Sequence, residues 1–99
     1  MARNRRKQTR IGFHEELEQI REDAAGIDVG SEELWVDVGR RKDSEPVRRF
    51  ETFTADLKAM AQWLVAKGIK TVAMESTGVY WIPACQILEA VGIEVSYLF

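Results

Sequence analysis

The chain has 99 residues, of which 45% are hydrophobic, and this size suits one small domain or part of a larger one. Its single cysteine excludes an internal disulfide, and one cysteine beside one histidine excludes most zinc sites. No apolar stretch reaches the roughly 18–20 residues that a membrane span needs, and the basic start leads into no signal-peptide core. These features predict a cytoplasmic protein with no membrane partner.

The formal net charge of −2 hides a basic amino terminus on an acidic body. No acid occurs within the first ten residues, where five side chains are basic: Arg3, Arg5, Arg6, Lys7 and Arg10. This pattern is found in nucleic-acid-binding proteins and also in solvated tails. We interpret residues 1–12 as a disordered basic arm, for which both roles stay open.

Residues 13–24 are predicted to form a short amphipathic helix. Phe13, Leu17, Ile20 and Ala24 follow helical spacing, with acidic residues between them. This apolar stripe would pack on the domain or on a partner.

The run from Ala25 to Ser31 has the composition of a strand but places Asp28 between Ile27 and Val29. In a strand, Ile27 and Val29 point to one face and Asp28 points to the other. A buried aspartate is costly unless it is paired, hydrogen-bonded or bound to a metal, and the flanking glycines leave room for a ligand. Asp28 is therefore a candidate functional residue, and the alternative is an aspartate that closes a turn.

Two further strands are predicted to complete an antiparallel meander with this one. Residues 34–38 alternate between aliphatic side chains and Trp or Asp, and residues 47–53 return as a third strand after a charged loop at 39–46. The basic residues of this hairpin would contact either a phosphate backbone or solvent: Arg40, Arg41, Lys42, Arg48 and Arg49.

A helix is predicted to start at the N-cap Thr54, with Asp56 in its first turn, and to be closed by Gly68. Its buried stripe would consist of four residues: Leu57, Met60, Ala61 and Leu64.

A parallel-type strand is predicted at residues 69–74, followed by a second helix and a last strand at 93–99. That helix has Pro83 in its first turn, ends at Gly92, and would turn Ile87, Leu88 and Val91 inward. The resulting order is βββαβαβ, an α/β fold in which no further element covers the final strand.

Glu75 is the second candidate functional residue, because it lies where an apolar strand meets a Ser-Thr-Gly turn. In open α/β sheets, ligands bind at the carboxyl ends of the strands. If the 69–74 strand lies parallel beside the Asp28 strand, the two carboxylates meet, and they repel unless a cation lies between them. Oxygen ligands favour Mg²⁺ or Mn²⁺ and hence metal-assisted phosphoryl transfer on a nucleic acid. The alternative for Glu75 is a simple capping acid.

Other chemistries have less support in the sequence. Ser76 has no nearby histidine, since His14 belongs to the amino-terminal helix, and Cys85 lies inside an apolar helix and is interpreted as core. Tyr80 and Trp81 would either stack on bases or pack the helix against the sheet.

Three segments together resemble one known family: Gly26–Ser31, Val47–Thr54 and Val72–Pro83. From about Ala25 to the end, the chain resembles the amino-terminal half of the RuvC-like DEDD domain of insertion-sequence-110 transposases. The run Glu-Ser-Thr-Gly-Val-Tyr-Trp is quite specific, whereas Gly-Ile-Asp-x-Gly alone is weak.

This resemblance implies a ribonuclease-H-like (RuvC-like) mixed sheet with the first and fourth strands side by side. Asp28 and Glu75 would match the first Asp and the Glu of a four-acid site for Mg²⁺ or Mn²⁺. Members of the family are bacterial or archaeal. They form homo-oligomers that cut and recombine DNA under the guidance of a structured RNA, with a nucleophilic serine in a separate carboxy-terminal domain.

The chain departs from the family pattern in two ways. The other two aspartates would follow the last strand, and the carboxy-terminal domain is absent, so residues 25–99 are interpreted as a partial domain of a truncated transposase that is inactive alone. Two alternatives are an actin-like ATPase or sugar-kinase phosphate-binding fragment, with Asp28 near Mg·ATP, and a non-catalytic nucleic-acid-binding remnant that uses the basic arm.

Overall fold

The computed structural model describes residues 22–76 and 78–98. The predicted basic arm at residues 1–12 and most of the predicted helix at 13–24 lie outside these residues. Ala24 is the described member of that helix's apolar stripe, and it begins a strand instead. The prediction was wrong at this position because Ala24 pairs with Thr71 in a parallel ladder, which requires extended backbone.

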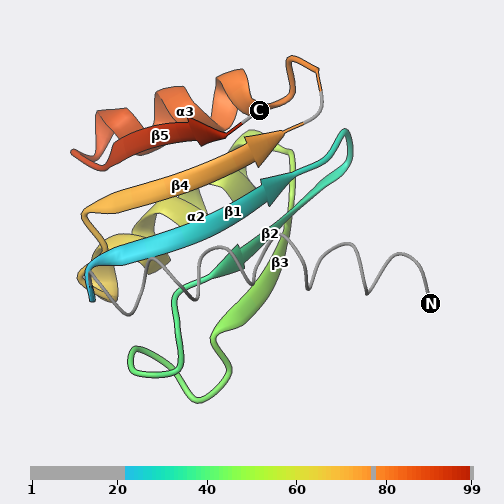
Figure 1. The fold of residues 1–99 in the computed structure, drawn as a ribbon. Coiled ribbons are helices and arrows are strands. Elements are labelled where there is room, and N and C mark those ends of the chain that lie inside the picture. The colour runs from blue at the N-terminus through green and yellow to red at the C-terminus, as the bar shows by residue number, and fades with distance from the viewer. Residues whose placement is uncertain (1–21, 77, 99) are drawn as a thin grey trace.

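The described residues form a five-stranded mixed sheet with two helices on one of its faces (Figure 1). The elements are β1 (Ala24–Val29), β2 (Glu33–Asp37), β3 (Val47–Glu51), α2 (Thr54–Ala66), β4 (Thr71–Ser76), α3 (Trp81–Ala90) and β5 (Glu94–Leu98). The strand order is β3-β2-β1-β4-β5, with β1 antiparallel to β2 and parallel to β4. The predicted βββαβαβ order and the ribonuclease-H-like arrangement are both confirmed.

The first three strands form the predicted antiparallel meander. The Gly30 amide donates to the Glu33 carbonyl at 2.9 Å and closes the β1–β2 turn. A Cβ at Gly30 would lie 3.2 Å from that same oxygen, so this close approach favours glycine. The third strand ends at Glu51 and is shorter than predicted. Phe53, predicted as the last residue of this strand, lies outside it and is 69% exposed.

Helix α2 buries the four predicted residues, Leu57, Met60, Ala61 and Leu64. Its amino-terminal boundary differs by one residue, because Phe53 occupies the N-cap and Thr54 is already helical. Phe53 has extended backbone, and its side chain makes no capping hydrogen bond, so the predicted Thr54 cap is wrong. Threonine is favoured at N-caps, but the extended backbone after β3 ends at Phe53, so the helix begins one residue earlier than the threonine preference predicts.

Both helices end at the predicted glycines. Gly68 and Gly92 have φ values of +74° and +86°, which residues with a Cβ adopt only at a cost. Behind Gly68, the Ile69 amide donates to the Leu64 carbonyl at 3.0 Å, and the Ile93 amide makes the equivalent bond to Leu88 at 3.0 Å. These bonds satisfy carbonyls at the helix ends and turn the chain back towards the sheet.

The strands that follow the helices begin later than predicted, at Thr71 and Glu94. Ile69 belongs to the turn before β4 but is still buried. In α3, Leu88 is buried as predicted, whereas Val91 is 44% exposed. The inward prediction for Val91 was wrong because it is the C-cap residue, beyond the last helical position.

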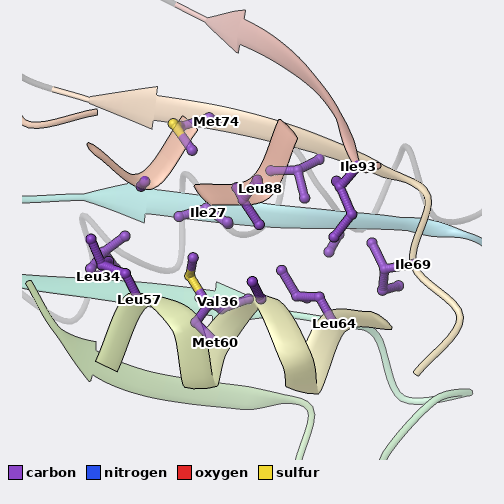
Figure 2. Close-up of a cluster of buried hydrophobic side chains, with 14 of the residues drawn as sticks. Ile27, Leu34, Val36, Leu57, Met60, Leu64, Ile69, Met74, Leu88 and Ile93 are labelled. Atoms are coloured by element: carbon purple, nitrogen blue, oxygen red, sulfur yellow. The ribbon is translucent and has the colours of Figure 1, made fainter. Parts of the chain in front are cut away.

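A single hydrophobic core lies between the sheet and the two helices (Figure 2). Ile27, Val36 and Met74 contribute from neighbouring strands, because Ile27 of β1 is the register partner of both Val36 on β2 and Met74 on β4. Met60 and Leu88 enter from α2 and α3. The core therefore uses one face of β1, β2 and β4, and the alternate residues of these strands belong to the opposite face.

Leu64→Ala tests how much this core contributes to stability. Leu64 is fully buried, so its truncation leaves a cavity, and we expect the free energy of unfolding to fall by about 2–5 kcal/mol. Chemical denaturation measures this loss. Val65→Ala is the matched control, because Val65 is the next residue of the same helix and is 49% exposed. Its loss should stay within about 0.5 kcal/mol, and equal losses in the two variants would contradict the packing described.

Candidate active site

The structure brings the two predicted acids together on neighbouring strands. Asp28 of β1 and Glu75 of β4 are direct partners in the parallel register. Adjacent strands lie about 4.8 Å apart, and register partners point to the same face of a sheet. The preceding pair in the register, Ile27 and Met74, belongs to the core, so both acids lie on the face opposite the helices. The predicted juxtaposition is confirmed.

The acid pair is only partly accessible to solvent. Asp28 is 8% exposed and Glu75 is partly buried. Trp35 is the register partner of Asp28 on β2, and Leu98 is the register partner of Glu75 on β5. The two acids therefore occupy central positions in the sheet, where the backbone is fixed by strands on both sides.

A third acid on this face has a structural contact. Asp37 is 3% exposed, and its carboxylate accepts a hydrogen bond from the Gly39 amide at 2.8 Å. This bond organises the start of the β2–β3 loop. Asp37 is the register partner of Gly26, two residues before Asp28, so it is not a direct neighbour of Asp28. Among residues 22–76 and 78–98, no three His, Cys, Asp or Glu side chains form a group that could hold a metal ion. The candidate site thus consists of two carboxylates.

The turn after β4 leads from the acid pair into α3. Gly78 has a φ value of +67°, and α3 begins at Trp81. The Trp81 ring packs edge-on against Tyr97 of β5, with 4.6 Å between the ring centroids. Of the two roles that the sequence left open for Trp81, packing between helix and sheet is the observed one. Tyr80 differs, because it is 47% exposed.

Cys85 belongs to the core, as predicted. The Tyr97 hydroxyl donates a hydrogen bond to its sulfur, and the thiol donates to the Glu89 carboxylate at 3.1 Å. Burial raises the pKa of the Cys85 thiol, which disfavours the nucleophilic thiolate. Burial and the bond to Cys85 raise the pKa of Tyr97 to about 12. This cluster fixes α3 to β5 and offers no nucleophile.

The raised pKa of Tyr97 predicts a loss of stability at high pH. The folded state retains the phenolic proton up to about pH 12, whereas the unfolded chain releases it near the ordinary tyrosine pKa of 10.0. The stabilisation is therefore complete below pH 10 and is lost between pH 10 and pH 12. Denaturation at several pH values should show this loss in the wild type and a smaller one in Tyr97→Phe. Phenolate absorbance supplies an independent check, since the late-titrating tyrosine should vanish in that variant.

Two basic residues of the β2–β3 hairpin form ion pairs with acids of the same chain. Arg41 contacts Glu22 at 2.8 Å. Arg49 pairs with Glu33 and lies 3.7 Å from Glu51. These contacts support the interpretation of a solvated hairpin, because the neighbouring carboxylates compete with phosphate for the guanidinium groups.

Arg48 faces the helix side of the sheet, opposite to Arg49. Its guanidinium lies 4.5 Å from the ring centroid of Trp63, a cation–π contact, and 3.8 Å from Asp43. A hydrogen bond from the Glu45 amide and the Lys67 ammonium at 3.1 Å lower the pKa of Asp43. Alternation along the strand predicts that Arg48 and Arg49 point to different faces of the sheet. Arg48 becomes a packing residue because α2 places Trp63 against its guanidinium.

Comparison with protein families identifies the domain that carries the acid pair. Residues 25–99 match the family model of IS110-type DEDD transposases. The chain belongs to this family. Membership implies a role in DNA transposition and binding to DNA, and DEDD transposases are typically metal-dependent. Among curated proteins, no sequence matches the chain. In the part of the chain that the structure describes, no helix is long and apolar enough to span a membrane.

Proposed function

We propose that Asp28 and Glu75 are two of the four carboxylates with which this transposase domain cuts and joins DNA strands. The observation that carries the proposal is their direct pairing across β1 and β4, on the face away from the core. The domain match covers both residues. Asp28 would take the place of the first Asp of the DEDD site, and Glu75 that of its Glu.

The donor set suits a hard divalent ion. Both groups are carboxylates, and Mg²⁺ and Mn²⁺ prefer oxygen ligands and bind through one or two protein carboxylates. Such an ion, when bound, supplies charge stabilisation at a phosphodiester. Asp28 and Glu75 would hold and orient it from fixed positions, because both belong to strands with neighbours on each side.

The two carboxylates alone form an incomplete site. Among the described residues no third acid joins them, and Asp37 is engaged with the Gly39 amide. The other two aspartates would come from sequence outside residues 22–98, after the last strand. We therefore propose that the 99-residue chain binds Mg²⁺ weakly and does not cut DNA by itself.

Guidance by a structured RNA and assembly into a homo-oligomer complete the proposal, on the strength of family membership. A non-catalytic role in nucleic-acid binding through the basic arm (Arg3, Arg5, Arg6, Lys7 and Arg10) is the second candidate, although the arm lies outside the described residues. The actin-like alternative gains no support, because residues 25–99 match a transposase family.

The metal site is tested with Mn²⁺ and the purified chain. Mn²⁺ should raise the unfolding temperature of the wild type, since a ligand that binds only the folded state stabilises it. Asp28→Asn and Glu75→Gln should each weaken binding at least about tenfold, equivalent to about 1.4 kcal/mol of lost interaction. Thermal unfolding across a Mn²⁺ titration measures both effects.

Glu94→Gln is the matched control for these variants. Glu94 starts β5, and its partner Thr71 lies four residues before Glu75 on β4, about 13 Å along the strand. The control should respond to Mn²⁺ like the wild type. An equal response in Asp28→Asn would contradict the metal site. DNA cleavage by the wild-type chain alone would refute the proposed inactivity, and its loss in Asp28→Asn would still support the site.

A further inference from the structure

The turn between β4 and α3 presents apolar side chains to solvent beside the candidate site. Val79 is 67% exposed, Tyr80 is 47% exposed and Ile82 is 38% exposed. The turn follows the carboxyl end of β4 (Figure 1), and Glu75 is the next-to-last residue of that strand. Single exposed apolar residues are common, but a cluster of neighbours beside a functional site indicates a contact surface.

The backbone of this turn holds the Tyr80 ring close to Gly78. Gly78 has a positive φ, which glycine adopts without steric cost. The Tyr80 ring folds back against this glycine, where a Cβ would lie 3.6 Å from Cε2 and 3.8 Å from Cδ2. One ring edge therefore lies against the turn, while much of the residue remains accessible.

The chemistry of the surface suits a nucleic-acid base. A base has a flat π-face that stacks on an aromatic side chain whatever the sequence. DNA is the partner that family membership implies, and a phosphodiester at Asp28 and Glu75 would bring its neighbouring nucleotides to this turn. Of the two aromatic residues at this turn, Trp81 is already committed to Tyr97, and Tyr80 is the exposed one.

We propose that Tyr80, flanked by Val79 and Ile82, stacks on an unpaired DNA base next to the phosphodiester bound at Asp28 and Glu75. The proposal rests on the proposed function and adds a substrate-binding residue to that site. Stacking would hold the strand beside the metal site without selecting its sequence, so target choice would be made elsewhere.

The test measures binding of the 99-residue chain to a fluorescently labelled single-stranded DNA, in EDTA, so that metal plays no part. Tyr80→Ala should weaken binding about 5- to 100-fold, the usual effect of removing one stacked base. Tyr80→Phe should bind like the wild type, because the ring remains. Val91→Ala is the matched control, since Val91 is 44% exposed just beyond the other end of α3, and it should also bind like the wild type.

The salt dependence separates stacking from charge. The slope of log affinity against log salt counts neutralised phosphates, so it should be the same in Tyr80→Ala and the wild type. The DNA-binding assay is done in EDTA and so does not depend on the metal site, whereas the metal site is tested separately by the response of Asp28→Asn to Mn²⁺. Failure of the metal site and failure of the stacking surface are therefore distinguishable.

Several results would overturn the stacking role: no detectable binding by the wild type, equal binding by Tyr80→Ala, or a changed salt slope in that variant. Thermal unfolding of each variant is measured first. A large drop in unfolding temperature for Tyr80→Ala would assign Tyr80 to packing and overturn the proposal. Tighter binding of an RNA of the same sequence, with the same dependence on Tyr80, would overturn the assignment to DNA.

Discussion

The parallel pairing of β1 with β4 is the constraint on which the site depends. These strands are separated in sequence by two strands and a helix, and their register sets Asp28 directly against Glu75. Because side chains alternate along a strand, a slip of one residue would send one acid into the hydrophobic core. Ile27 and Met74, which share the next pair towards the amino ends of these strands, oppose such a slip because both are buried among apolar neighbours.

One face of the sheet stabilises the fold, and the other carries the acids of the candidate site. One face packs against α2 and α3 in a continuous core that includes Met60, Leu64 and Leu88 (Figure 2). The other carries Asp28, Asp37 and Glu75 at positions fixed by the same strands. Burial on the first face supplies the free energy that holds these strands, and with them Asp28 and Glu75, in register.

At the carboxyl end of β4, two adjacent aromatic residues have different roles. Trp81 and Tyr97 pack together, and Tyr97 is also tied to Cys85, so the start of α3 is anchored to β5. Tyr80 precedes this anchor and stays accessible. The anchored residues fix the position of the turn, and the exposed one is available to a ligand.

Local signals in the sequence determined much of this protein. Strand alternation around Asp28, the apolar stripe of α2 and the glycines at 68 and 92 act through neighbours in the chain, so they gave the βββαβαβ order and the helix ends. The motif around Glu75 indicated the family. The assignment of Thr54 as a cap and of Val91 as a buried residue failed, because each lies at a helix boundary that depends on the flanking backbone.

The tertiary structure fixed the register and the long-range contacts, including the pairing of Asp28 with Glu75 that the sequence made conditional on parallel strands. The register of Asp28 with Glu75 and the contact of Arg48 with Trp63 each join residues that are distant in sequence. Tyr80 and Trp81 are adjacent in sequence, but only Trp81 packs against Tyr97 of β5. Periodicity assigns a side chain to a face of its own strand or helix. It cannot say which other element covers that face, because this follows from the packing of the whole sheet with its helices.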